Sequence, residues 1–334
     1  MLNVPFRLSP AGKDYLWGGI RLKTEYGKNM DKTPLAETWE CSTHPDGLCI
    51  VADGEYKGET LVSVLKEHPE YIGSHPDRSS DAPGELPILI KFIDAAKDLS
   101  VQVHPDDKYA YRNENGSRGK TEVWYVLDAT PDAKLVYGLA HDSDPDTIRE
   151  AVTKGTIAEH LQYVPIAQND VFYVEAGTIH AIGAGALIAE IQENSNITYR
   201  LYDYDRKDKD GNTRPLHIDK ALEVANLNRA SAPVQPMRVL RYEPGVAKEL
   251  LCRCKYFEVH RMLVSEETGK GIAYRSDSLS FRVLLCIDGS GSLSYKDNGE
   301  PTEVNITKGS CVFIPADSVK IKLHGKLQLL DICG

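Results

Sequence analysis

Residues 169–206 read NDVFYVEAGTIHAIGAGALIAEIQENSNITYRLYDYDR, and this stretch decides the fold. In its first part, apolar and polar residues alternate on either side of a turn at Gly177, which is the period-2 pattern of half-buried strands. His180 therefore follows a tight turn and points to one face of a predicted sheet. The strand-like sequence then continues through Glu190 to Arg200, and we expect the same sheet to carry both residues alongside the histidine.

Composition places the chain among ordinary globular proteins. Its 334 residues are 41% hydrophobic and 26% charged, a length and composition that suggest two domains. The net charge of -10 argues against nucleic-acid or acidic-membrane partners, because both need a basic face. No apolar stretch approaches ~20 residues and no signal-peptide pattern is present, so we expect a cytoplasmic protein. The seven cysteines are an odd number without close even pairing, which fits free thiols in a reducing compartment.

The order of predicted elements indicates where the chain divides. Helices are predicted from Thr60, after an N-cap at Asp144, and over residues 217–228, between many short strands. Residues 228–240 carry two prolines and little periodicity, which favours a boundary between domains 1–235 and 236–334. The second domain reads as short strands with Gly and Asp turns and is predicted to be all-β.

Four polar residues occupy inward-facing positions on three predicted strands. Gln102 and His104 share one face of the strand that ends before Pro105, while Glu122 and His180 belong to two further strands. Two imidazoles, a carboxylate and an amide oxygen suit zinc or a similar divalent ion, with room for water or substrate. Each residue alone also fits a surface polar or packed core side chain. Their common alignment favours a metal site.

An internal similarity links the two predicted domains. DVFYVEAGTIH at residues 170–180 aligns with SCVFIPADSVK at residues 310–320, and both read as strand, turn, strand. His180 is replaced by Lys320 in the second copy. We therefore expect two related β-units, of which only the first binds metal.

Several motifs resemble those of one enzyme family. The strings SVQVHPDD, GKTEVWYVL, AGTIHAIGAG and ENSNITYRLYDYDR are similar to those of the type I phosphomannose isomerases, or mannose-6-phosphate isomerases, of the cupin superfamily. YLWGG and AETWECSTHPDG near the N-terminus resemble the same family, whereas the C-terminal third resembles only loosely the small second barrel of its short members. The resemblance implies a mainly β fold of two cupin-like β-barrel (jelly-roll) units with a few short helices. It also implies reversible interconversion of mannose 6-phosphate and fructose 6-phosphate on one zinc ion per chain.

Carried over position by position, the resemblance assigns roles to individual residues. The implied zinc ligands are Gln102, His104, Glu122 and His180, and the implied catalytic arginine is Arg200. The basic and hydroxyl residues expected on the phosphate side are Ser100, Lys120, Arg206 and Lys91.

Glu190 is a candidate from chemistry rather than from a motif. An aldose-ketose isomerase moves a proton between C1 and C2, and a partly buried carboxylate beside a metal can be tuned for that task. The alternative role for Glu190 is to orient a ligating histidine. Two catalytic roles are also open for the metal. It can stabilise the enediolate charge directly, or it can act through a bound water.

Two other functions remain open at this point. A cupin dioxygenase would use iron and need no phosphate pocket, and a non-catalytic sugar-sensing cupin would not need Arg200. Because Arg200 and all four ligand positions are present, we favour the isomerase. The expected partner is a small sugar phosphate, with neither nucleic acid nor membrane, and the chain is expected to be a monomer or a homodimer.

Overall fold

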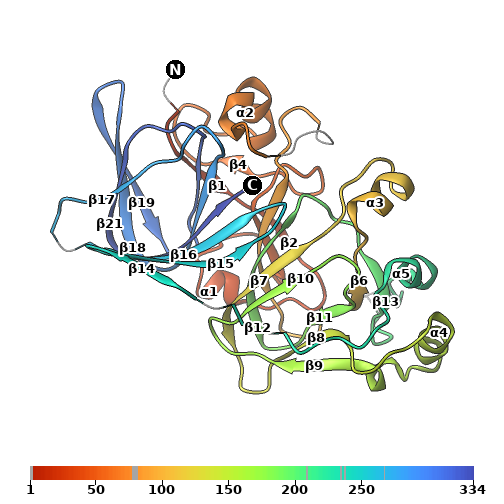
Figure 1. Cartoon of the computed structure of the whole chain (residues 1–334). Helices are drawn as coiled ribbons and strands as arrows, with labels where there is room; N and C mark the ends of the chain where they lie inside the picture. The colour runs from red at the N-terminus through yellow and green to blue at the C-terminus, as the bar shows by residue number, and fades with distance from the viewer. Residues whose placement is uncertain (1–2, 77–81, 208–209, 234, 237, 267) are drawn as a thin grey trace.

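Strands dominate the computed structural model of the chain (Figure 1). It describes residues 3–76, 82–207, 210–233, 235–236, 238–266 and 268–334. The prediction of a mainly β fold with a few short helices is confirmed. Residues 234 and 237, within the predicted linker, lie outside the described residues.

The strands and helices have the following bounds. The strands are β1 Phe6–Ser9, β2 Ala11–Lys13, β3 Glu37–Cys41, β4 Ile50–Val51, β5 Ile88–Asp94, β6 Val101–Val103, β7 Glu122–Ala129, β8 Lys134–Leu139, β9 Leu161–Pro165, β10 Val171–Val174, β11 His180–Ile182, β12 Ala186–Glu193, β13 Tyr199–Tyr202, β14 Leu240–Glu243, β15 Val246–Arg253, β16 Glu258–Glu266, β17 Ile272–Tyr274, β18 Arg282–Asp297, β19 Glu300–Thr307, β20 Cys311–Ile314 and β21 Ile321–Cys333. The helices are α1 Arg21–Thr24, α2 Leu61–Glu67, α3 Asp107–Asn113, α4 Pro145–Lys154 and α5 Ile218–Val224, with short 3-10 helices η1 Pro69–Ile72 and η2 Ile157–Glu159.

Two sheets face each other in the first unit. One has six strands in the order β10-β7-β12-β5-β3-β2, and the other has five in the order β13-β6-β11-β8-β9. Side chains of both sheets, among them Ile93, Trp124, Leu135 and Ile182, form one buried cluster between them. Alternation along each strand puts these residues on the inner face, as expected for half-buried strands.

Helices α4 and α5 cover the outer face of the five-stranded sheet (Figure 1). Asp144 caps α4 as predicted and accepts hydrogen bonds from the backbone N–H groups of Asp146 and Thr147. Thr60, where a helix was predicted to begin, is the N-cap of α2 and accepts a hydrogen bond from the Ser63 N–H. None of the helices that the structure describes has the length and apolar character needed to span a membrane. All seven cysteines are free thiols, as predicted.

The third sheet has ten strands and belongs mostly to the C-terminal part of the chain. Its main path is β14-β15-β16-β21-β18-β20-β1-β4, so the N-terminal strands β1 and β4 complete a sheet otherwise built from residues after 239. The ten-stranded sheet contains strands from both sides of the predicted boundary between residues 235 and 236. That domain boundary therefore stays a prediction. Gly291 of the long strand β18 lies close to β21, and a Cβ added to it would lie 2.0 Å from the His324 carbonyl oxygen. That close approach requires glycine.

The two units repeat one strand order. In the first unit the order is β10-β7-β12-β5-β3, and in the second it is β20-β18-β21-β16-β15. Strands β10 and β20 are the segments that align between residues 170–180 and 310–320. The six-stranded sheet and the ten-stranded sheet share one buried cluster, which includes Val123 and Ile191 from one and Val283 and Ile332 from the other. The opposite face of the six-stranded sheet packs in the core of the first unit, and the opposite face of the ten-stranded sheet packs in a separate core of the second unit.

Candidate active site

The candidate site lies between the two sheets of the first unit. Gln102 of β6 stands directly opposite both His180 of β11 and Arg200 of β13, so these three residues share the five-stranded sheet. Glu190 does not, because β12 belongs to the six-stranded sheet, and our prediction of one common sheet is wrong for this residue. The continuous apolar sequence hid the turn at Gly183–Gly185, where the chain passes from one sheet to the other.

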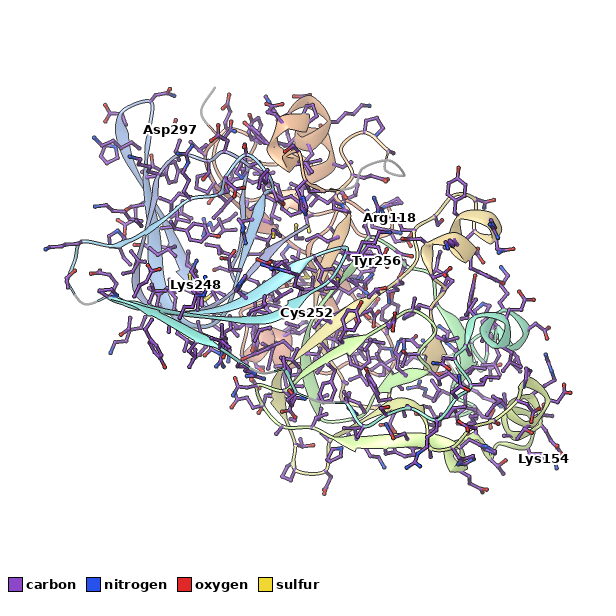
Figure 2. The ribbon with its side chains drawn as sticks, in the orientation of Figure 1. Arg118, Lys154, Lys248, Cys252, Tyr256 and Asp297 are labelled. Carbon is purple, nitrogen blue, oxygen red and sulfur yellow. The ribbon has the colours of Figure 1, made fainter. Side chains whose placement is uncertain are left out.

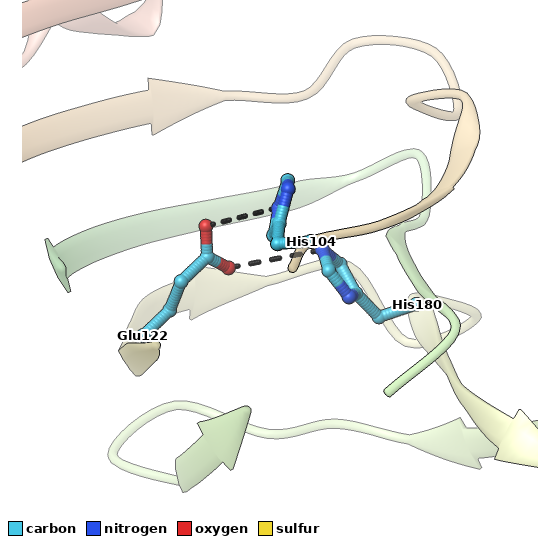
Figure 3. A group of neighbouring side chains, drawn as sticks. All are labelled: His104, Glu122 and His180. Carbon is cyan, nitrogen blue, oxygen red and sulfur yellow. Dashed lines mark ion pairs between the residues drawn. The ribbon is translucent and has the colours of Figure 1, made fainter. Parts of the chain in front are cut away.

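Two histidines and one glutamate converge in the interior (Figure 3). His104 Nε2 lies 3.4 Å from Glu122 Oε1, and His180 Nε2 lies 3.8 Å from Glu122 Oε2. The three ligand atoms all lie within 4.8 Å of one another, and all three side chains are buried. This spacing allows one small cation to contact all three groups.

The protonation states also suit a cation. His180 Nδ1 donates to the Thr178 carbonyl oxygen over 2.8 Å, which leaves the Nε2 lone pair directed at Glu122. Burial lowers the pKa of His104 to about 3 and also lowers the pKa of His180, so both imidazoles are neutral near pH 7. Burial acts to raise the pKa of Glu122, but the Lys120 ammonium beside it acts in the opposite direction, and that pKa lies well below its usual range. The set is therefore two neutral imidazoles around one carboxylate.

Gln102 and Lys120 connect this cluster with the neighbouring cavity. The Gln102 side-chain nitrogen lies 3.5 Å from His180 Nε2, and a rotation of the amide group would present its oxygen instead. Lys120 Nζ lies 2.5 Å from Glu122 Oε1 and 3.2 Å from His104 Nε2. The cluster thus already accommodates a positive charge beside Glu122, and a donor set of this kind fits a divalent ion.

A cavity of about 280 Å³ adjoins the cluster. Its lining combines aromatic and aliphatic walls with converging charged groups, as small-molecule sites do. The lining residues are Tyr15, Trp17, Glu37, Lys91, Ile93, Leu99, Ser100, Gln102, Lys120, Ile182, Glu190, Asn196, Thr198, Arg200 and Arg214. Nine of the ten predicted site residues thus lie in this lining or in the cluster beside it, and the tenth, Arg206, lies elsewhere.

Glu190 reaches the cavity from the six-stranded sheet and is fixed by two partners. Lys91 Nζ lies 2.9 Å from its Oε1, and the Trp124 indole nitrogen donates to its Oε2 over 2.9 Å. Burial acts to lower the pKa of Lys91, but Glu190, Glu37 and Glu122 outweigh it and raise that pKa, so the lysine stays charged. Among the described residues, no hydrogen bond joins Glu190 to either imidazole.

Arginines line the opposite side of the cavity. Arg200 Nε donates to Ser100 Oγ over 3.3 Å, and its Nη1 donates to the Pro215 carbonyl oxygen over 3.0 Å. Arg214 makes two hydrogen bonds to the Asp203 carboxylate, of 2.7 and 2.6 Å. Burial, and then the nearby Arg214, lower the pKa of Arg200, which nevertheless remains a cation at neutral pH.

The structure does not bring Arg206 to the cavity. Its guanidinium is engaged by the Asp203 carboxylate and the Asp98 carbonyl oxygen, and the residue is absent from the cavity lining. Arg214 stands there instead, and its position in a charged loop gave no sequence signal for such a role. Tyr15, Trp17 and Glu37 also line the cavity without having been predicted as site residues, although the motifs YLWGG and AETWECSTHPDG contain them.

The fold and the site together define the class of protein, a two-unit β protein of the cupin type with a buried candidate metal cluster. Residues 5–122 match the family model for the catalytic domain of type I phosphomannose isomerase, and residues 247–333 match that for the cupin domain of mannose-6-phosphate isomerase. This chain belongs to the type I phosphomannose isomerase family.

Relatives of full length support this assignment. Mannose-6-phosphate isomerase of Streptococcus mutans is 38% identical over 316 residues, which cover 94% of this chain and 93% of the relative. Mannose-6-phosphate isomerase ManA of Bacillus subtilis is 35% identical over 334 residues, 99% of either chain. The crystal structure of the mannose 6-phosphate isomerase from Bacillus subtilis superposes with a TM-score of 0.87 at 32% identity, covering 98% of this chain and 99% of that one.

Proposed function

We propose that this protein interconverts mannose 6-phosphate and fructose 6-phosphate, with zinc held by Gln102, His104, Glu122 and His180. The observation that carries the proposal is the buried His104–Glu122–His180 cluster, which borders a cavity lined by cations on one side and by Glu190 on the other. Family membership supports the same reaction, because the full-length relatives are named for it.

The cations of the cavity account for recognition of an anionic substrate by an acidic chain. Arg200 and Arg214 project from one wall, and Lys120 lies beside the metal cluster. A guanidinium offers a fork of donors to phosphate oxygens and an ammonium offers a point charge. We assign Ser100, Lys120 and Arg214 to the phosphate side. Arg206, which pairs with Asp203 outside the cavity, then acts only by supporting that wall.

Proton transfer needs a base at a fixed position. Glu190 is the carboxylate that enters the cavity from the sheet opposite Arg200, and Lys91 and Trp124 hold its two oxygens. We assign it the transfer of the proton between C1 and C2 of the open-chain sugar. Lys91 then positions the Glu190 carboxylate and does not bind the phosphate.

Negative charge develops on two sugar oxygens as the enediolate forms. A zinc ion at the cluster would supply Lewis-acid stabilisation of that charge when bound. From the other side, Arg200 presents donors whose orientation is fixed by Ser100 and Pro215. Donors fixed before the reaction stabilise developing charge most effectively, so we assign Arg200 to the transition state.

The test is a coupled assay for fructose 6-phosphate made from mannose 6-phosphate, run with and without a chelator. We expect turnover that the chelator abolishes and that added zinc restores. Activity that persists after the bound metal has been removed would refute the zinc assignment. No turnover by the metal-loaded protein, together with oxygen consumption that depends on ferrous iron, would favour the dioxygenase instead.

A further inference from the structure

The second unit has a polar cavity of its own. It measures about 270 Å³, close to the size of the first cavity, and opens in the ten-stranded sheet. Its lining residues are Lys248, His260, Ala273, Tyr274, Arg275, Arg282 and Asp331. Lys248 lies over this sheet, on the side of the molecule away from helices α3 to α5 (Figure 2). The cavity is therefore separate from the candidate active site.

The polar residues of this second cavity stand on the inner face of the second unit. His260 of β16 and Leu284 of β18 both lie directly opposite Asp331 of β21, and residues directly opposite each other in a sheet point to the same side. Leu284 belongs to the buried core of the second unit, so Asp331 and His260 face the same interior. Lys248 and Arg282 are two residues away from core positions on their own strands and point the same way.

Comparison of the two units places this cavity where the first unit has its active site. Strand β21 takes the place of β12 in the shared strand order, and β16 takes the place of β5. On the inner face, β12 carries Glu190 opposite Lys91, and β21 carries Asp331 opposite His260. Both units thus present a buried carboxylate beside a basic residue at the end of a core. The similarity concerns binding groups and not metal ligands, since the one group of three candidate metal ligands within the described residues is that of the first unit.

Asp331 does not accept hydrogen bonds from the Lys248 ammonium or the Arg282 guanidinium. Tyr274 donates to Asp331 Oδ1 over 2.7 Å, whereas Lys248 Nζ and the nearest Arg282 nitrogen both lie 3.7 Å from that carboxylate. A distance of 3.7 Å exceeds that of a hydrogen bond. The part of the chain that the structure describes gives neither the Lys248 ammonium nor the Arg282 guanidinium a hydrogen-bond acceptor. Two partly buried cations with unused donors therefore face one cavity.

We propose that this cavity is a second, non-catalytic binding site for a small polyhydroxylated monophosphate. Arg282 and Lys248 bind the phosphate oxygens, which need charged donors. The Asp331 carboxylate and the Tyr274 hydroxyl accept hydrogen bonds from sugar-type hydroxyl groups at the inner end. Because the described residues of this cavity form no group of three candidate metal ligands, we assign it binding without reaction. The proposal stands on the second cavity alone and does not depend on the proposed isomerase activity.

The test counts binding sites on the full-length protein. The probe is radiolabelled glucitol 6-phosphate, a hexitol phosphate that has no carbonyl group and cannot be isomerised. Equilibrium dialysis of the unaltered protein should give two sites per chain. Arg282→Gln should weaken one of them by about tenfold or more, the effect of losing a charge-assisted hydrogen bond. Arg241→Gln is the matched control, because Arg241 is exposed on β14 and lies outside the second cavity.

Tryptophan fluorescence separates the two sites. All three tryptophans belong to the first unit, and Trp17 lines its cavity, so fluorescence reports the first site and dialysis reports both. Arg282→Gln should leave the fluorescence titration and kcat unchanged. Binding that Arg282→Gln leaves equally tight, whether the unaltered protein shows one site or two, would overturn the proposal. Absence of isomerase activity alongside two intact sites would instead contradict only the proposed function.

Discussion

Glu190 Oε1 lies 2.9 Å from Lys91 Nζ, and only 5% of either side chain is exposed. The two residues stand directly opposite each other on β12 and β5, so the sheet register itself makes the pair. Burying one of these charges alone would cost several kcal/mol, roughly, and the partner offsets that cost. The pair thus holds the Glu190 carboxyl group at the cavity, with its position set by two strands.

Replacing this carboxylate should affect the chemical step. We expect Glu190→Gln to lower kcat by about 10²-fold or more, the usual contribution of a positioned acid-base group, with little change in KM. The variant must be shown to retain its metal and its fold, because Lys91 then loses its closest charged partner. A kcat within a few-fold of the unaltered protein, with metal bound, would rule out Glu190 as the proton carrier.

The metal cluster should hold about one divalent ion per chain. His104→Ala and His180→Ala each remove one of three converging groups, and elemental analysis should show that most of the metal is lost. His141→Ala is the matched control, since that histidine is exposed and lies outside the cluster. Two ions per chain in the unaltered protein would contradict our expectation that the unit with Lys320 binds none. Undiminished metal in both cluster variants would refute the site itself.

Arg200 and Lys120 should differ in the kinetic constant that they affect. Arg200→Ala should lower kcat, on the order of 10²-fold if the guanidinium stabilises developing enediolate charge. Lys120→Ala should raise KM more than it lowers kcat, and its defect should shrink with mannose, which lacks the phosphate. Metal content is measured in parallel, because Lys120 lies 2.5 Å from Glu122. Lys97→Ala, an exposed lysine, serves as the control. If Arg200→Ala keeps near-normal kcat, the role assigned to Arg200 is wrong.

The buried Glu193 carboxyl group, beside the partly exposed Asp107, predicts how stability depends on pH. Burial, followed by the neighbouring Asp107, raises the pKa of Glu193 to about 8, while its ordinary value is 4.5. Between these values the folded protein holds a proton that the unfolded chain has released. The free energy of unfolding contributed by Glu193 is therefore fully present below pH 4.5 and is lost as pH rises toward 8, on the order of a few kcal/mol in all.

Glu193→Gln isolates this effect. Glutamine imitates the protonated side chain and can still accept the 2.8 Å hydrogen bond from the Thr121 N–H. Denaturant unfolding at several pH values should show a flatter decline for the variant than for the unaltered protein between pH 5 and pH 8. Identical slopes for the two proteins would mean that Glu193 does not carry the proton.

Local patterns were sufficient for the metal cluster and for most strands. The parity of His104, Glu122 and His180 predicted a common interior, and the structure brings their ligand atoms together. Period 2 in a strand is a local property that sheet pairing preserves, because an inward-facing residue stays inward whichever strand lies beside it. The similarity between residues 170–180 and 310–320 could be recognised from the sequence for the same reason, because strand periodicity is a local property.

Which sheet each strand joins was decided only by tertiary structure. From the sequence we expected Glu190 on the same sheet as His180, but after the turn at Gly183–Gly185 the chain enters the facing sheet, which carries Glu190. We also expected Arg206 at the cavity, but its guanidinium pairs with Asp203 outside the cavity. Strands β1 and β4 pair in the sheet of the second unit although they begin the chain. Such pairings join residues distant in sequence, and their energy comes from packing and charge contacts that no local window contains. The sequence by itself thus determined which residues face inward, and the tertiary structure determined which of them meet.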